Sequence, residues 1–545
     1  MRCNPRRDLL AGVTVAIVAL PLALGFGVSS GLGAEAGLAT AVVAGALAAL
    51  FGGSHLQVSG PTGAMTVVLV PIVAAYGPGG VLTVGVLAGI LLIGLALLRA
   101  GRYMRYVPAP VVEGFTLGIA CVIALQQVPG ALGVPKPEGE KVLVVAWRAV
   151  GEFAKAPNWT ALGLAAGVAA VMLLGARLRP AVPFSIVAVI AATVAVEVFE
   201  PSGARPIGAL PSGLPVPSLD FLDTAALGSL LAPAVAVAAL AALESLLSAT
   251  VADGMASGQR HDPDRELFGQ GVANLAAPLF GGVPATAAIA RTAVNVRTGA
   301  GSRLAALTHA AVLAVIVFAA APLVSRIPLA ALAGVLLATA IRMVEVGALR
   351  AMARATRSDA VVLVLTAVAT LVLDLVQAVV IGLVAAGALA LRAVAGQARM
   401  DRLELRAELP GDHGEEEYAL LAEHIVVYRI DGPLFFAGAH RFLLELSEVA
   451  DARVVVLRMS RITTVDATGA LVLKDAVQKL ARRGITVLAS GIRPGQRRTL
   501  EAVGALEPLR PYGRDYPTTP EAVAAARARL RAAGTVPVPG EVSGA

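Results

Sequence analysis

Two charged side chains lie inside long apolar stretches, where ionisable groups are rare and usually functional. Glu244 lies within the run Ala241–Ser245, and Arg291 follows Ala290 in a short apolar segment. Because an unpaired charge away from water is costly, we expect the two to pair when no anion is bound. An incoming anion would then take over Arg291 while Glu244 accepts a proton. The alternative is a structural ion pair with no part in turnover.

Polar neighbours of these charges suggest supporting roles. Ser248 lies one helical turn after Glu244 and shares its face, so its hydroxyl can serve a substrate, serve Glu244, or bond to its own helix backbone. Gln270 and Asn274 are spaced for hydrogen bonds between helices. Glu266 lies near a predicted helix end, where caps and loop contacts are its expected partners.

The sequence carries no signature of an enzyme. Its six histidines and two cysteines show no metal-ligand spacing, and no Gly-rich nucleotide-binding loop is present. We therefore predict no catalytic residue, no metal and no cofactor. Energy for any transport would come from ion or substrate gradients.

Two proline-led segments are short for a full membrane span. One begins at Gly60-Pro61-Thr62-Gly63 and continues to Val73, and the other runs from Val283-Pro284 to Val294. They are the third and tenth segments of the chain and so take matching places in two halves, which is the pattern of a transporter site. A half-helix N-terminus offers free N–H groups and a positive dipole end to an anion. The alternative is two proline kinks in ordinary spans.

The composition indicates a membrane protein. The 545 residues are 57% hydrophobic and 15% charged, whereas soluble domains carry about 25% charged residues. Long apolar runs predict an all-α polytopic domain of about 14 segments between residues 8 and 396.

Basic residues gather in alternate loops, as the positive-inside rule requires. We predict that the chain lies in the inner membrane. The pattern then places the N-terminus, and everything after residue 397, in the cytosol. The net charge of +7 therefore reflects topology and not nucleic-acid binding. The basic residues are Arg2, Arg6, Arg7, Arg99, Arg102, Arg105, Arg177, Arg179, Arg260, Arg265, Arg297, Arg303, Arg342, Arg350, Arg354, Arg357, Arg392 and Arg399.

The chain divides into a membrane part and a soluble part. We predict a transmembrane transport domain at 1–397, a polar linker at 398–417, an α/β domain at 418–533 and a disordered tail at 534–545. In the soluble part, predicted strands at 424–430, 453–458 and 485–489 alternate with predicted helices at 439–449 and 466–483 and a further helix after Pro494. Alternation of this kind predicts a parallel or mixed sheet.

Several motifs resemble the sulfate permease (SulP) family of anion transporters. The resemblance covers nearly the whole chain, and the soluble part looks like a STAS domain, the sulfate-transporter and anti-sigma-antagonist module. The resembling motifs are Ala19-Leu20-Pro21-Leu22-Ala23-Leu24-Gly25-Phe26-Gly27, Gly60-Pro61-Thr62-Gly63, Gly269-Gln270-Gly271 with Asn274, and Phe280-Gly281-Gly282-Val283-Pro284.

The resemblance implies a fold of two inverted seven-helix repeats, divided into core and gate domains, in a homodimer that works by an elevator-like motion. It implies an anion site between the two half-helices, with Glu244 at the acidic position of the eighth helix. The residues that it places around the anion are Phe26, Thr62, Gly63, Ala64, Met65, Ala287, Ala288, Ile289, Ala290 and Arg291.

Departures from the family pattern bear on the coupling ion and the substrate. Leu22 stands where many sulfate-type members carry glutamine. The first three segments otherwise look like the family's sodium-dependent bicarbonate transporters, which lack an arginine at the position of Arg291. A fixed positive charge there repels sodium, so we predict proton coupling.

The predicted function is secondary active transport of an inorganic anion, with sulfate favoured and bicarbonate or a dicarboxylate left open. An uncoupled exchanger or a channel on the same fold is the second class. A nucleobase transporter shares the fold, but its family lacks a STAS domain, so residues 418–512 argue against it.

In the soluble part, Asp466-Ala467-Thr468-Gly469 resembles a loop that is phosphorylated in anti-sigma antagonists. Thr468 would then be a regulatory switch, and the domain would bind a cytosolic partner. The alternative is that Asp466 caps the following helix and Thr468 only supports the turn.

Overall fold

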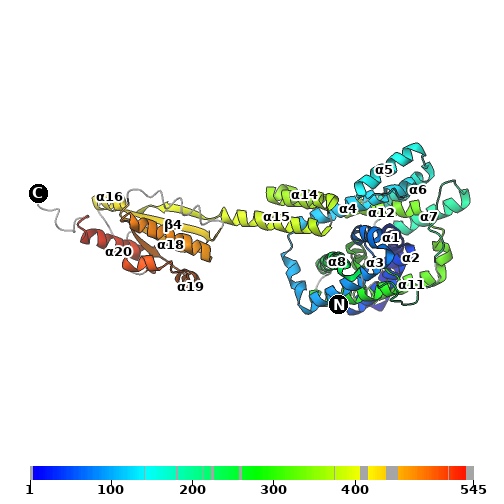
Figure 1. The fold of residues 1–545 in the computed structure, drawn as a ribbon, viewed down its shortest axis with the longest axis horizontal. Helices are drawn as coiled ribbons and strands as arrows, with labels where there is room; N and C mark the ends of the chain where they lie inside the picture. Colours follow the sequence, from blue (N-terminus) through cyan, green and yellow to red (C-terminus); the bar gives the residue numbers. More distant parts are fainter. Residues whose placement is uncertain are drawn as a thin grey trace. The chain divides into compact units, whose positions relative to one another are not determined.

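A computed structural model describes residues 4–139, 141–179, 182–210, 213–222, 226–256, 260–373, 375–405, 415–436, 452–512 and 515–535. The chain forms two compact units, Met1–Ala386 and Gly387–Ala545. The first consists of helices, and the second contains a sheet with helices on it (Figure 1).

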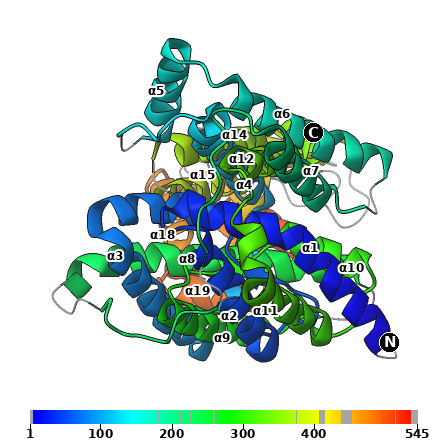
Figure 2. The ribbon, with the colours of Figure 1, turned by 90° about the vertical axis from the view of Figure 1, so that its right-hand side faces the viewer.

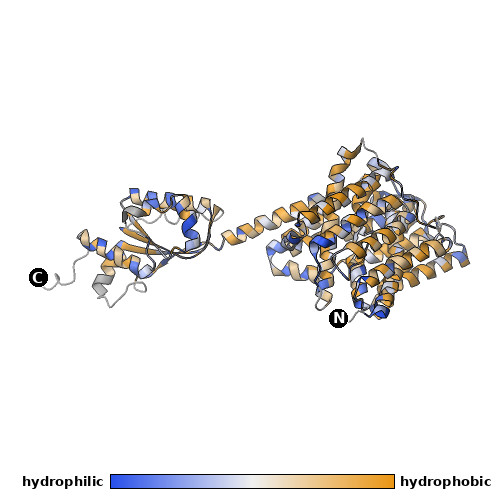
Figure 3. Ribbon diagram, turned by 90° about the horizontal axis from the view of Figure 1, so that it is seen from below, coloured by the Kyte–Doolittle hydropathy of each residue, from blue (hydrophilic) through white to orange (hydrophobic). Residues whose placement is uncertain are grey.

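The first unit is built from apolar helices, as the composition predicts. Within the described residues, nine helices are long and apolar enough to cross a membrane, and apolar residues dominate this unit in Figure 3. The helices are α1 (Pro5–Ser30), α2 (Ala34–Phe51), α3 (Gly63–Leu97), α4 (Ala109–Leu132), α5 (Val142–Lys155), α6 (Trp159–Leu178), α7 (Phe184–Phe199), α8 (Leu227–Met255), α9 (Pro263–Ala276), α10 (Ile289–Arg297), α11 (Arg303–Val324), α12 (Leu329–Met343), α13 (Val346–Ala355) and α14 (Arg357–Val372), followed by α15 (Leu375–Ala395) at the boundary with the second unit.

Helix α3 contains two of the predicted segments. Its backbone leaves the helical conformation at Gly77, with φ 66° and ψ −174°, and Pro78 follows directly. A positive φ is readily adopted by glycine, and proline cannot donate to the preceding turn. The third predicted segment is therefore a short helix before the kink, and α10, with nine residues, is its short counterpart.

The helices pack in two groups, which occupy the lower and upper halves of this unit in Figure 2. The core bundle consists of α1, α2, α3, α8, α9, α10 and α11, and the gate bundle consists of α4, α5, α6, α7, α12, α13 and α14. Small residues allow the close approach that membrane helices need. A Cβ at Gly37 of α2 would lie 2.0 Å from the Ala23 carbonyl oxygen of α1, so only glycine fits there.

Two short strands cross in the core bundle and position both half-helices. Strand β1 (Ser59–Gly60) pairs antiparallel with β2 (Thr286–Ala287). Helix α3 begins after β1 and α10 begins after β2, so the two helices leave the crossing in opposite directions. Thr62 caps α3, because its hydroxyl accepts a hydrogen bond of 3.3 Å from the Met65 N–H.

The second unit has a four-stranded mixed sheet in the order β3-β4-β5-β6. Strands β4 (Ile425–Leu434), β5 (Val454–Val465) and β6 (Thr486–Ser490) are parallel neighbours, and β3 (Arg399–Leu403) pairs antiparallel with β4. Separate apolar clusters bury the two faces of the sheet. The helices are α16 (Glu415–His424), α18 (Ala467–Arg482), α19 (Pro494–Ala502) and α20 (Thr519–Ala532).

The predicted sheet is confirmed, with two differences. Residues 399–403, which we predicted to be linker, form the edge strand β3, where pairing with β4 compensates for a charged sequence without a continuous apolar face. Strands β4 and β5 run to Leu434 and Val465, beyond their predicted ends. The predicted helix at 439–449 and most of the predicted tail lie outside the described residues.

Candidate functional site

Arg291 is the largest fully buried side chain in the core bundle and lies at the strand crossing. It is the third residue of α10 and is 1% exposed. Its Nη2 donates a hydrogen bond of 2.8 Å to the Pro61 carbonyl oxygen at the start of the other half-helix. Its Nη1 has no hydrogen-bond partner within the described part of the chain. One arginine therefore connects the two half-helices and keeps a free donor.

Gly60 makes room for this guanidinium. Its φ is 151°, which residues with a side chain rarely adopt, and a Cβ there would lie 2.7 Å from Arg291 Nη1. Both the backbone conformation and the space behind it therefore require glycine.

Glu244 of α8 reaches the same place through Thr62. Its Oε2 accepts a hydrogen bond of 3.0 Å from the Thr62 hydroxyl, which in turn caps α3. The expected direct ion pair with Arg291 is not formed: in the described part of the chain no carboxylate oxygen of Glu244 lies within 4 Å of a guanidinium nitrogen of Arg291, although their charges interact through space. The reason is that Pro61 takes the guanidinium and Thr62 takes the carboxylate, so each charge has another partner.

The other predicted site residues gather around the two helix starts, with unequal access. Thr62, Gly63, Ala64 and Met65 are buried, and a Cβ at Gly63 would lie 3.1 Å from the Phe26 ring. On the α10 side, Ala287 is buried, Ala288 is half-buried, and Ile289 and Ala290 are exposed. The start of α3 is thus covered, whereas the start of α10 is open.

Ser248 is hydrogen-bonded to α10, an arrangement that the sequence did not suggest. Its hydroxyl donates 3.0 Å to the Thr292 hydroxyl of α10, and Thr292 also accepts from the Val58 N–H at 3.1 Å. One turn earlier, the hydroxyls of Ser245 and Thr286 are 2.9 Å apart. These contacts fasten α8 to the strand crossing. Sequence reasoning missed Ser245, Thr286 and Thr292, although Ser245 adjoins Glu244 and Thr286 lies in the proline-led segment.

The polar pair of α9 was predicted to bond to other helices, but its tertiary hydrogen bonds go to β1 and to the residue before β2. The Asn274 amide donates 2.9 Å to the Ala285 carbonyl oxygen and accepts 2.8 Å from the Ala285 N–H. Gln270 Nε2 donates 2.7 Å to the Ser59 hydroxyl. Glu266 makes the predicted loop contacts, accepting from the Gly53 and Ser54 N–H groups at 2.9 and 3.0 Å.

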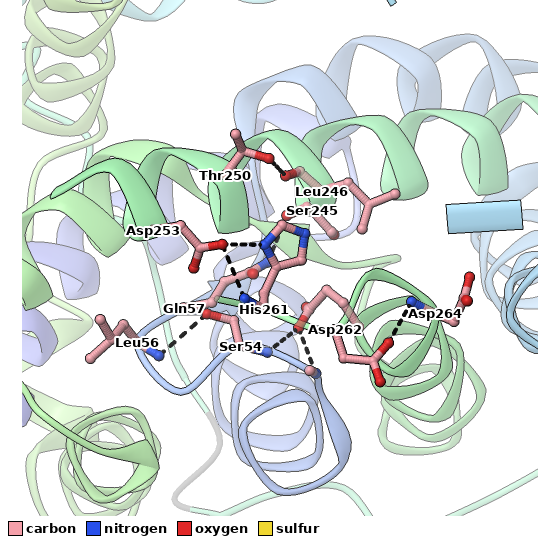
Figure 4. Close-up of polar contacts among 12 residues, drawn as sticks. Ser54, Leu56, Gln57, Ser245, Leu246, Thr250, Asp253, His261, Asp262 and Asp264 are labelled. Atoms are coloured by element: carbon pink, nitrogen blue, oxygen red, sulfur yellow. Dashed lines mark hydrogen bonds and ion pairs between the residues drawn. The ribbon is translucent and has the colours of Figure 1, made fainter. Parts of the chain in front are cut away.

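A second polar cluster joins the end of α8 to the start of α9 (Figure 4). The carboxylate of Asp253 accepts from the His261 backbone N–H at 3.0 Å and lies 2.7 Å from the imidazole Nδ1. Figure 4 also shows Gln57, whose Nε2 donates 3.2 Å to the Ser245 carbonyl oxygen. The helix that carries Glu244 is therefore tied at both of these points to the segments around it.

His55 lies in the loop between α2 and β1, outside the helices. His55 is exposed, and its partial desolvation, together with the positive charges of Arg303 and Arg265, lowers the pKa of His55. Both arginines donate to the last carbonyl groups of α2, Arg303 to Leu50 and Arg265 to Phe51. The C-terminal end of α2 is thus capped by cations, with an imidazole beside them that resists protonation.

The regulatory candidate lies in the second unit. Asp466 caps α18: its Oδ1 accepts 2.7 Å from the Gly469 N–H, and its Oδ2 accepts 3.1 Å from the Phe436 N–H. Thr468 is exposed in the first turn of the same helix. The capping role of Asp466 is therefore confirmed, and the Thr468 hydroxyl is accessible at a helix N-terminus.

No group of three or more His, Cys, Asp or Glu side chains is placed to hold a metal ion in the part of the chain that the structure describes. The polar residues at the crossing instead combine a buried cation, two helix N-termini and a nearby carboxylate. Groups of these types have the chemistry to bind an anion and to take up a proton at a separate atom.

Two protein families match successive parts of the chain. Residues 6–366 match the model of the sulfate permease family, and residues 420–521 match that of the STAS domain. The chain is 33% identical to a putative sulfate transporter, YvdB, of Bacillus subtilis, over 92% of this chain and 94% of that one. It is 30% identical to the bicarbonate transporter BicA of a Synechocystis strain, over 91% and 90%.

Solved structures show the same fold. The transmembrane domain of a cyanobacterial bicarbonate transporter, BicA, is 32% identical, with a TM-score of 0.62 over 70% of this chain and 97% of that one. The structure of SLC26A9 matches with a TM-score of 0.78 at 17% identity, over 97% and 91%. The chain is therefore a multi-pass membrane transport protein, not an enzyme, and it belongs to the sulfate permease family with a C-terminal STAS domain.

Proposed function

We propose that this protein carries sulfate across the membrane together with protons, by alternating access. The observation that supports the proposal most strongly is the free Nη1 of Arg291, a buried donor on a fixed cation between two helix N-termini. A dianion gains more from this positive field than a monoanion does. The likeness to a putative sulfate transporter supports the same cargo.

Bicarbonate is the second candidate cargo. It is favoured by the likeness to the bicarbonate transporter BicA, both in sequence and over nearly all of a solved transmembrane domain. The site itself accepts either anion, because backbone N–H groups and a guanidinium recognise carboxylate-like and tetrahedral oxyanions alike. A dicarboxylate would use the same donors through one of its carboxylates.

Proton coupling is assigned to Glu244. Its carboxylate touches Thr62, which caps the half-helix of the anion site, so the charge on Glu244 and the occupancy of the site affect each other. When an anion neutralises Arg291, the stabilising effect of that cation on the Glu244 carboxylate is lost, and protonation becomes easier. The fixed charge of Arg291 opposes sodium at this place.

The charge pattern and the fold support a proposal for the membrane, the orientation and the assembly of the transporter. We propose that it lies in the inner membrane with both termini in the cytoplasm, as the positive-inside pattern favours. We also propose a homodimer, a motion of the core bundle against the gate bundle, and a cytosolic partner for the STAS domain. The exposed Thr468 hydroxyl beside the α18 dipole supports phosphorylation as a switch.

The test is uptake of radiolabelled sulfate into proteoliposomes with an inward proton gradient and no sodium. Accumulation that collapses with a protonophore is the expected result. Bicarbonate and fumarate are added in turn as competitors. Downhill uptake that ignores the proton gradient would point to an exchanger or channel, and absent sulfate uptake with transport of a competitor would move the cargo to that anion.

A further inference from the structure

His309 is a buried polar side chain that the anion site described above does not use. It lies on α11 and is 0% exposed, and neither ring nitrogen has a hydrogen-bond partner within the described residues. Arg291 Nη1 is likewise buried without a partner. Native proteins rarely keep such groups without a reason, since each loses its hydrogen bonds to water on folding.

The surroundings of two glycines show that both groups lie along the contact between β1 and α2, which we call the seam. A Cβ at Gly60 would lie 2.7 Å from Arg291 Nη1 and 3.4 Å from the Cα of Ala41. A Cβ at Gly45, one turn further along α2, would lie 3.3 Å from the Ser59 carbonyl oxygen and 4.0 Å from His309 Cδ2. Because Ser59 and Gly60 are consecutive, the guanidinium and the imidazole both lie along this seam. The charge of Arg291 acts on the ring of His309.

A neutral imidazole suits this position. A second positive charge beside Arg291 would be repelled in a place away from water, so His309 is uncharged there. Its unprotonated nitrogen can accept a hydrogen bond. A carboxylate in its place would hold the arginine equally well, but it would cancel the charge that attracts the anion.

We propose that His309 is a positioning residue for Arg291. Nη1 carries two hydrogens: one donates to a water molecule that bridges to the acceptor nitrogen of His309, and the other stays free for the anion. The guanidinium is thereby kept in one orientation with its full charge. The inference rests on the proposed function, since it acts through the anion site. It adds α11 to the elements that define substrate affinity.

The test uses full-length protein in proteoliposomes and compares KM and maximal rate for sulfate. We expect His309→Ala to raise KM about tenfold or more while the maximal rate changes less than about twofold. His309→Gln keeps a hydrogen-bonding amide and should recover most of the affinity. Thr308→Ala, on the same helix, is the matched control, because the Thr308 hydroxyl bonds to its own helix at the Leu304 carbonyl oxygen.

An Arg291→Lys background separates positioning from packing. Lysine keeps the positive charge but lacks the forked guanidinium that His309 would position. In the Arg291→Lys background, His309→Ala should therefore raise KM little further. An equal rise in both backgrounds, or wild-type KM in His309→Ala, would overturn the inference alone. If the wild type carries bicarbonate or fumarate instead of sulfate, the same comparison is made with that anion. A wild type that carries none of the three would overturn the proposed function and this inference with it.

Discussion

Substituting alanine for Gly60 tests the geometry of the anion site without touching a charged group. The new Cβ would lie 2.7 Å from Arg291 Nη1, and the backbone φ of 151° would be strained. Backbone strain costs about 1–3 kcal/mol and lowers stability. The new Cβ would also displace the guanidinium and so weaken its hydrogen bond to the Pro61 carbonyl oxygen. A hydrogen bond from a charged group contributes about 1.5–3 kcal/mol.

The displacement of the Arg291 guanidinium is the effect that weakens anion binding. At about 1.4 kcal/mol per factor of ten, Gly60→Ala should weaken anion binding about 10- to 100-fold. The assay is isothermal titration of the purified protein with sulfate and with bicarbonate, alongside its thermal melting temperature. Gly94→Ala in α3 is the control, because nothing lies within 4 Å of a Cβ at Gly94, and it should bind as the wild type does. Wild-type affinity in a folded Gly60→Ala protein would refute the placement of Arg291.

Three further predictions follow from the charges. Arg291→Ala should abolish anion binding in the same titration, because it removes the buried cation; residual binding within about tenfold of wild type would contradict this. Glu244→Gln should retain binding and lose proton-driven accumulation in proteoliposomes, and preserved accumulation would remove Glu244 from the coupling. The pKa of His55 is lower in the folded state than in the unfolded chain, so protonation of His55 favours unfolding. The stability that the neutral ring contributes is present above the unfolded pKa of about 6.5 and is lost as pH falls below it toward the folded pKa. Between pH 7.5 and 5.5, a range of about two units around that value, the melting temperature of His55→Asn should therefore fall less than that of the wild type. An equal fall would contradict the lowered pKa of His55.

Much of the architecture could be predicted because it depends on local sequence. Apolar runs predict membrane helices wherever they occur, and the alternation of strands and helices predicts the STAS sheet. The two proline-led segments predict half-helices, because proline and glycine act on their own backbone. The cost of a buried charge marks Glu244 and Arg291 before any fold is known.

The partners of those charges could not be predicted. Ser248 bonds to Thr292, and Glu244 bonds to Thr62 instead of Arg291, because the antiparallel crossing of β1 and β2 sets which atoms meet. The edge strand β3 forms for a similar reason: its charged sequence gives no strand signal, and β4 supplies the hydrogen bonds.

The sequence by itself therefore determined the membrane helices, the soluble α/β domain and the residue types of an anion site. Only the tertiary structure decided that Arg291 keeps a free Nη1, that Gly60 makes space for it, and that His309 of α11 is buried without a hydrogen-bond partner among the described residues. The physical reason is the distance along the chain over which each effect acts. Periodicity and the cost of burial act within one segment, whereas hydrogen bonds within about 3 Å depend on how segments more than 200 positions apart are packed.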